Sequence, residues 1–182
     1  MALGRQSEAI KEIQTAEQLD PLSSLVQSTF GRVLYRALKY EEAVPHLKRA
    51  IELDPRNFGA YGRLGDVYVQ IGTYDEAIAA FGKVRDLRPD GAYPVRIARV
   101  YALMGKGREA MKIVSGTKAG AFETAGVYAA LGDRDEAFRI LEKGIEARDS
   151  LLVYIKEDPS LESLHSDPRW KELLRRMNFP SD

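Results

Sequence analysis

Apolar residues recur at spacings of three and four along most of the chain, with polar residues between them. This is the period of amphipathic helices, whereas half-buried strands would alternate at every second residue. Turn residues interrupt the pattern at regular intervals, so the helices fall into pairs. The pattern therefore predicts an all-α fold, with a lone helix over residues 6–18 followed by helical hairpins at roughly 23–53, 57–87, 91–115 and 119–148.

The turn and packing positions repeat along the chain with a period of about 34 residues. Pro21, Pro55 and Pro89 are each separated by one such period, and each follows a similar apolar run. Two further columns advance together in steps of 34, 34, 33 and 27 residues. One column holds Gly4, Leu38, Gly72, Gly105 and Gly132, and the other holds Ala9, Ala43, Ala77, Ala110 and Ala137. Since turn and helix positions are copied together, the chain is a tandem repeat.

The repeated residues resemble the tetratricopeptide repeat family, whose pattern places an aromatic residue, Leu-Gly, Tyr, Ala, Phe and Pro at fixed offsets. One copy shows this pattern best, with Tyr61, Leu64, Gly65, Tyr68, Ala77, Phe81 and Pro89. The resemblance covers residues 1–149 and implies a right-handed α-α superhelix, a solenoid of stacked hairpins. It divides the chain into a half-repeat at 1–20, hairpins at about 22–55, 56–89, 90–117 and 118–149, and a non-repeat cap at 150–182.

Small residues recur at fixed positions on both helices of each hairpin, which predicts a close approach of the two backbones. On the first helices these are Gly31, Gly65, Ala98 and Ala125, and on the second helices Ala43, Ala77, Ala110 and Ala137. We expect Gly72, Gly105 and Gly132 to end the first helices in a left-handed turn.

The last step of the repeat, 27 residues, is too short for a full hairpin and requires a shortened segment after Met111. Gly116, Lys118 and Gly120 fit an early end of the helix there. The third hairpin is therefore expected to have a short second helix, and the superhelix a local change in curvature.

The array begins in the middle of a repeat, because Ala2 to Arg5 align with the end of a first helix whose body is missing. Residues 6–18 are then either an N-terminal cap or the start of a fragment from a longer chain. We favour the fragment, because the ends of a solenoid need polar faces. This helix is expected to show Ile10, Ile13 and Leu19 partly to solvent.

The tail after residue 149 departs from the repeat and predicts a capping helix. Asp167 is an N-cap candidate, and Pro168 suits the first position of a helix over residues 169–177. Its apolar stripe, expected to lie on the last hairpin, is Trp170, Leu173, Leu174 and Met177. The stretch from Ala125 to Pro180 is also similar to the tail that follows tetratricopeptide arrays in large bacterial signalling proteins. That second resemblance rests on motifs such as Asp158-Pro159 and Ser166-Asp167-Pro168 and implies a regulatory or scaffolding role.

Composition narrows the possible partners and chemistry. The 182 residues suit one domain with one continuous core, and 27 basic residues balance 27 acidic ones, so neither nucleic acid nor an anionic membrane is an expected partner. There is no cysteine and only two histidines, so no metal site is expected. No apolar run approaches the roughly 20 residues that span a bilayer. The chain is therefore interpreted as soluble and cytoplasmic.

No catalytic constellation stands out, and neither catalytic residues nor a cofactor are predicted. The sequence lacks a Walker-type phosphate loop, a Gly-x-Ser-x-Gly elbow and a His-Glu-x-x-His pair. His46 and His165 are interpreted as packing or surface residues, since no acid or nucleophile is spaced to act with them. The acidic pairs at 41–42, 75–76 and 135–136 open second helices, where negative charge complements the helix dipole. The chain is therefore predicted not to be an enzyme.

What remains is the concave face that first helices line in this family. The residues predicted to form a peptide-binding groove there are Ser28, Arg32, Tyr35, Arg36, Asp66, Val69, Gln70, Arg99 and Leu103. Arginines in such a groove suit an acidic or C-terminal peptide through bidentate contacts, although they are equally consistent with ordinary solvated charges. The sequence does not reproduce the Lys, Asn and Arg clamp of the chaperone-binding members. The predicted partner is thus an unidentified protein or peptide, and the alternative is self-association into a homodimer.

Overall fold

A computed structural model describes residues 2–89, 93–156 and 158–179, and the statements below refer to them. The chain divides into two compact units, Met1–Gly91 and Ala92–Asp182, which are described separately. This differs from the single continuous core expected from length. The physical reason is that a solenoid hairpin packs only on its neighbours, so a long array needs no common centre.

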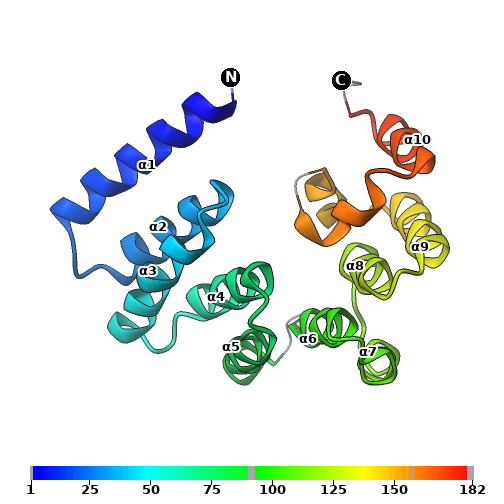
Figure 1. Cartoon of the computed structure of the whole chain (residues 1–182), viewed down its shortest axis with the longest axis horizontal. Coiled ribbons are helices and arrows are strands. Elements are labelled where there is room, and N and C mark those ends of the chain that lie inside the picture. The colour runs from blue at the N-terminus through cyan, green and yellow to red at the C-terminus, as the bar shows by residue number, and fades with distance from the viewer. Residues whose placement is uncertain (1, 90–92, 157, 180–182) are drawn as a thin grey trace. The chain divides into compact units, whose positions relative to one another are not determined.

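The first unit contains the predicted lone helix and two hairpins (Figure 1). Its helices are α1 (Ala2–Leu19), α2 (Ser24–Arg36), α3 (Tyr40–Leu53), α4 (Phe58–Ile71) and α5 (Tyr74–Leu87). The hairpins are α2 with α3 and α4 with α5, and α4 stacks mainly on α3 of the preceding hairpin. The helix periods read from the sequence are thus confirmed in this unit.

Glycines let the two helices of each hairpin approach closely, as predicted. A Cβ atom added at Gly65 of α4 would lie 2.5 Å from Cε1 of the Phe81 ring on α5. At Gly31 of α2, an added Cβ would overlap the side chain of Leu47 on α3 in the same way. Gly72 ends α4 at φ 84°, a left-handed conformation that glycine adopts without strain.

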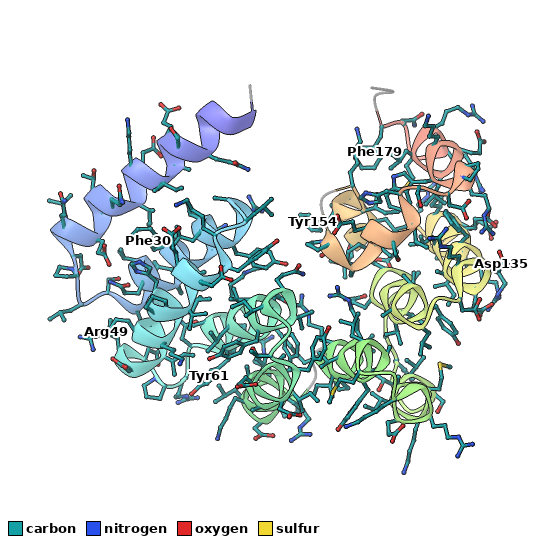
Figure 2. The ribbon with its side chains drawn as sticks, in the orientation of Figure 1. Phe30, Arg49, Tyr61, Asp135, Tyr154 and Phe179 are labelled. Atoms are coloured by element: carbon teal, nitrogen blue, oxygen red, sulfur yellow. The ribbon has the colours of Figure 1, made fainter. Side chains whose placement is uncertain are left out.

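Helix α1 covers the open face of the first hairpin through an apolar seam and a polar contact. Ile13 is buried against Phe30, which Figure 2 shows between α1 and the first hairpin. Beside this seam, the side-chain amide of Gln27 donates to Glu17 Oε1 at 2.9 Å. The Oε1 atom of Gln27 lies 2.9 Å from His46 Nδ1. The expectation that Ile13 faces solvent is therefore wrong, because α1 turns this residue onto the hairpin.

The other two apolar residues named on α1 behave as expected. Ile10 is only half-buried, and Leu19 at the end of α1 is 82% exposed. His46 is a packing residue, as interpreted from the sequence, since its ring stacks on Phe30 with centroids 3.9 Å apart.

The second unit contains two more hairpins and the tail. Its helices are α6 (Tyr93–Leu103), α7 (Gly107–Ser115), α8 (Ala121–Leu131) and α9 (Arg134–Glu146), followed by η1 (Ser150–Tyr154), η2 (Pro159–Leu164) and α10 (Pro168–Arg176). Helix α7 has 9 residues where α5 has 14, which confirms the short second helix predicted from the last, shortened step of the repeat. Of the two helices of the preceding hairpin, α8 packs mainly on α6 and only slightly on α7.

The tail is part of the core of the second unit. Helix α10 begins as predicted, with the Asp167 carboxylate accepting from the Arg169 backbone N–H at 3.0 Å. The side-chain and backbone hydrogen bonds from Arg169 hold the pKa of Asp167 at about 2. The two 3₁₀ helices η1 and η2 were not predicted. Their buried residues Leu152, Leu161 and Leu164 join Trp170 and Leu173 of α10 in one apolar cluster with α8 and α9.

Candidate functional site

The first unit holds a cleft of about 540 Å³ between the N-terminal halves of α2 and α4. Both are first helices of their hairpins, which are the helices predicted to line a groove. The lining residues are Ser24, Leu25, Ser28, Thr29, Arg32, Asp54, Asn57, Gly59 and Arg63. Its volume lies within the range of about 300–1,000 Å³ that ligand-binding clefts occupy.

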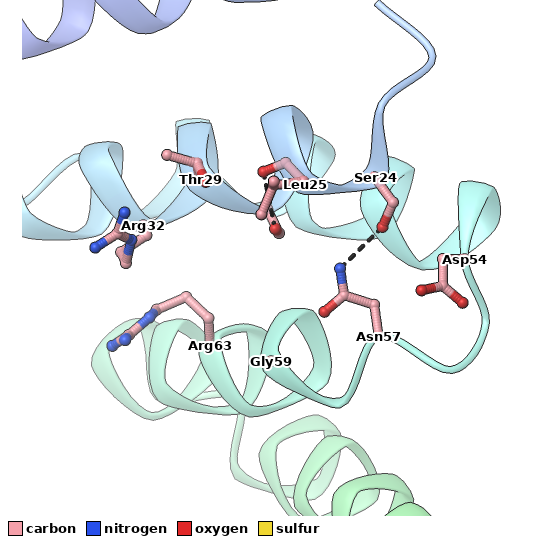
Figure 3. Close-up of a pocket in the computed structure, with 9 residues that line it drawn as sticks. Ser24, Leu25, Thr29, Arg32, Asp54, Asn57, Gly59 and Arg63 are labelled. Atoms are coloured by element: carbon pink, nitrogen blue, oxygen red, sulfur yellow. Dashed lines mark hydrogen bonds between the residues drawn. The ribbon is translucent and has the colours of Figure 1, made fainter.

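One end of the cleft is held by a chain of hydrogen bonds that joins three helices. Figure 3 shows its bond between Asn57 and Ser24. Asn57 is the N-cap of α4, and its Oδ1 accepts from the Ala60 backbone N–H at 2.9 Å. The Asn57 amide donates to Ser24 Oγ at 2.8 Å, and this hydroxyl donates to the Ala50 carbonyl of α3 at 2.8 Å. The first turns of α2 and α4 are therefore fixed to each other and to the end of α3.

The opposite end of the cleft is basic. Arg32 on α2 and Arg63 on α4 extend toward the same end (Figure 3). Arg63 Nη1 lies 3.2 Å from Asp66 Oδ2, and its guanidinium stands 5.1 Å from the centre of the Tyr35 ring. Arg32 is exposed. Asp66 and Tyr35 thus orient Arg63 at this end of the cleft.

The structure brings some of the predicted groove residues together and leaves others apart. Ser28 and Arg32 line the cleft. Tyr35 and Asp66 are not part of the lining, but both contact Arg63, which is. The remaining predicted residues lie outside the lining: Arg36 is exposed, Val69 is buried and Gln70 is half-buried on the first unit, while Arg99 is half-buried and Leu103 is 36% exposed on the second. Their role in binding stays a prediction.

Arg63 is a cleft residue that the sequence reasoning missed. The groove was assigned to one stripe of each first helix, and on α4 that stripe held Asp66, Val69 and Gln70 but not Arg63. Because successive helical residues turn by about 100°, Arg63 lies about 60° to one side of Asp66, on the side of the preceding hairpin. The signal in the sequence that could have found it is its charge. Arg63 is a second cation on a first helix, and it lies on the flank of α4 nearest to α2.

The second unit has a smaller cleft of about 440 Å³ at the start of α8, lined by residues that include Thr124, Lys143 and Asp149. Its acidic group has a structural role, because the N-cap position of α8 is Gly120, which offers no side chain. Asp149 Oδ2 accepts from the Ala121 backbone N–H at 2.9 Å, and its Oδ1 accepts from the Leu151 backbone N–H at 3.0 Å. One carboxylate therefore caps both α8 and η1.

Glu123 lies near this capping carboxylate, and its own negative charge is only partly balanced by favourable contacts. Its Oε2 is buried without a hydrogen-bond partner. Burial is the main cause that raises the pKa of Glu123, and the negative charges of Asp149 and Asp158 add to it. The Glu123 backbone and the charge of Arg96 act in the opposite direction.

Replacing Glu123 by glutamine is expected to stabilise the protein at neutral pH. A carboxyl group whose pKa is raised on folding costs stability above its unfolded pKa, and that cost disappears as the pH falls through the folded and then the unfolded value. The gain should stay below about 1 kcal/mol, because the side chain is partly exposed and screened by solvent. Thermal unfolding of both proteins between pH 4 and 8 measures it, and a difference that does not change with pH would contradict this explanation.

Within residues 2–89, 93–156 and 158–179, no group of three or more His, Cys, Asp or Glu side chains could hold a metal ion. None of the helices in that part of the chain has both the length and the apolar character required to span a bilayer.

The fold and its open clefts define a class of protein: an all-α repeat of helical hairpins, the architecture of protein-interaction scaffolds. Residues 29–92 match the family model described as tetratricopeptide repeat. This match and the structures below support the tetratricopeptide repeat family, as the residue pattern predicted. No curated protein matches the sequence.

Solved structures also resemble the chain. MamA from strain MSR-1 is 30% identical, with 63% of this chain and 66% of that chain covered and a TM-score of 0.56. MamA from strain AMB-1 is also 30% identical, with 58% of each chain covered and a TM-score of 0.52. A thermophilic TPR protein of Thermus thermophilus is 21% identical over 90% of this chain and 92% of that one, with a TM-score of 0.66, and shows likeness of fold alone. The chain thus spans less than two thirds of the length of both MamA chains.

Proposed function

We propose that the first unit binds an extended acidic segment of a partner protein in the cleft between α2 and α4. The observation that carries the proposal is the pair of arginines, Arg32 and Arg63, directed to one end of that cleft from facing helices. A guanidinium group presents paired donors that match a carboxylate, so two of them favour an anionic ligand over a neutral one. The protein would then act by holding its partner rather than by chemistry.

The local structure supports a preformed site. The hydrogen bonds from Asn57 through Ser24 to the Ala50 carbonyl fix the spacing of the two cleft helices. Asp66 and Tyr35 restrict Arg63 before any ligand arrives. Binding to such a site loses less conformational entropy than binding to mobile side chains, which favours affinity.

The test uses a fluorescein-labelled peptide, acetyl-Gly-Ser-Glu-Glu-Leu-Ser-Gly-amide, and its counterpart with Gln for both Glu residues. Fluorescence anisotropy measures the binding of each peptide. We expect the wild-type chain to bind the Glu peptide more tightly than the Gln peptide. Replacing Arg32 and Arg63 together by alanine should weaken its binding by about tenfold or more, since each charged hydrogen bond contributes about 1.5–3 kcal/mol.

The matched control removes two arginines elsewhere on the first unit. Arg49→Ala with Arg85→Ala changes the net charge equally, and both side chains form ion pairs outside the cleft, with Glu52 and Asp86. This control should bind the acidic peptide as the wild type does. Equal binding of the Glu and Gln peptides to the wild type would show that the cleft does not recognise acidic segments.

Self-association is a second candidate function, favoured by exposed leucines where α1 meets α2. Leu19 and Leu22 are 82% and 67% exposed, which is unusual for large apolar side chains that neighbour one another in the sequence. A second copy of the chain could cover them. Light scattering over a wide concentration range decides this point, since a strictly monomeric chain excludes it.

We also propose that the chain is the regulatory or scaffolding part of a larger bacterial signalling protein. The support is the likeness of its tail to those that follow tetratricopeptide arrays in such proteins. In this arrangement the cleft would capture a partner, and the activity would belong to another domain.

A further inference from the structure

We infer that the cleft between α2 and α4 selects a dipolar segment: an acidic residue at the arginine end, an apolar residue in the middle and a basic residue at the Asp54 end. This inference rests on the proposed function and adds the chemical class of the ligand. The two ends and the centre of the cleft differ in charge and polarity (Figure 3).

The end opposite the arginines carries a negative charge. Asp54 follows the last residue of α3 and is exposed at that end of the cleft (Figure 3). Its Oδ1 accepts from the Arg56 backbone N–H at 2.9 Å, while Oδ2 has no partner within the described part of the chain. A lysine or arginine of a ligand can therefore approach Asp54 without displacing an existing ion pair.

The centre of the cleft offers an apolar contact. Leu25 lies on α2 between the two charged ends and is 74% exposed, although it lines a concave surface. An apolar ligand side chain laid on Leu25 would remove the surface of both groups from water, which is favourable in proportion to the area covered. A purely acidic ligand would leave Leu25 uncovered and bring a negative charge close to Asp54.

The geometry of α4 sets the spacing of the three ligand residues. Asn57, beside Asp54, and Arg63 are six residues apart, which is about 9 Å along a helix axis at 1.5 Å per residue. An extended peptide advances about 3.3 Å per residue, so it covers this length in about three residues. The acidic and basic residues of the ligand should therefore be two or three positions apart, with the apolar residue between them.

The experiment compares three labelled peptides, acetyl-Gly-Ser-Glu-Leu-Ser-X-Gly-amide, in which X is Lys, Gln or Glu. The wild-type chain should bind the Lys peptide about three- to fivefold more tightly than the Glu peptide, the effect of a single exposed ion pair. Asp54→Lys should reverse this order. Asp54→Asn is the matched control, because its side-chain oxygen can still accept from the Arg56 backbone N–H, and it should bind the Lys and Glu peptides about equally.

The outcomes separate this inference from the proposed function. If the wild type binds the Lys and Glu peptides equally and both lose affinity when Arg32 and Arg63 are removed, the acidic site stands and the dipolar inference is overturned. If affinity does not depend on the two arginines at all, the proposed function fails as well. A preference for Lys that Asp54→Lys leaves unchanged would also overturn the inference, because the basic residue would then contact another group.

Discussion

Replacing Leu161 by alanine is expected to lower the free energy of unfolding of the second unit by about 2–5 kcal/mol, the range for large-to-small changes in a packed core. Leu161 lies on η2 in the tail, yet it is fully buried in the cluster that joins the tail to α8 and α9. The change removes apolar contacts and leaves a cavity that the surrounding side chains fill only in part. The single tryptophan, Trp170, lies in the same cluster, so its fluorescence during urea unfolding reports the effect.

Val153→Ala provides the control for this substitution. Val153 belongs to the same tail, on η1, but is 62% exposed, so its truncation should change stability by less than about 0.5 kcal/mol. Equal, small effects of the two substitutions would show that the tail does not stabilise the second unit. It would then be an appendage rather than a cap.

Replacing Gly65 by alanine is expected to destabilise the first unit by about 1–3 kcal/mol, although alanine is the better helix former. The new Cβ would lie 2.5–2.8 Å from three atoms of the Phe81 ring. That ring is buried in the hairpin, so it can yield only if α4 and α5 move apart. Far-UV circular dichroism in urea measures the change, since the only tryptophan belongs to the other unit.

Gly82→Ala is the matched control, because it makes the same chemical change on α5 of the same hairpin. A Cβ atom at Gly82 would meet nothing within 4 Å. Alanine there should stabilise the unit by about 0.5–1 kcal/mol, the cost of glycine inside a helix. If Gly65→Ala stabilised the protein as Gly82→Ala does, close approach at Gly65 would not be the reason for the glycine.

Much of the fold was predictable because repeated positions have local causes. The helix period, the left-handed glycines and the caps act within a few residues, and copying them in every hairpin made each signal visible several times. The tail lacked this repetition, so only α10 was predicted, from Asp167 and Pro168. The 3₁₀ helices η1 and η2 are too short to show a period. The position of η2 depends on its contacts with α8, and η1 is held by Leu152 in the apolar cluster of the second unit.

The candidate site was predictable only in part. Ser28 and Arg32 were found because they lie on the exposed stripe of a helix whose period is clear in the sequence. Arg63 was missed because its position in the cleft depends on how α4 stacks beside α2. Asp54 was not among the predicted groove residues, and its place at one end of the cleft follows from the loop that joins α3 to α4.

The residue pattern was enough to predict the helical hairpins, their turns, the short α7 and the interaction class of the fold. These features follow from side-chain period, backbone conformation and repeat length, which are properties of nearby residues. Three features appear only once the helices are packed: α1 buries Ile13, η2 enters the core of the second unit, and one cleft contains Arg32, Arg63, Leu25 and Asp54. Each of these depends on packing between elements distant in sequence, where many small contacts and the angles between helices set the outcome.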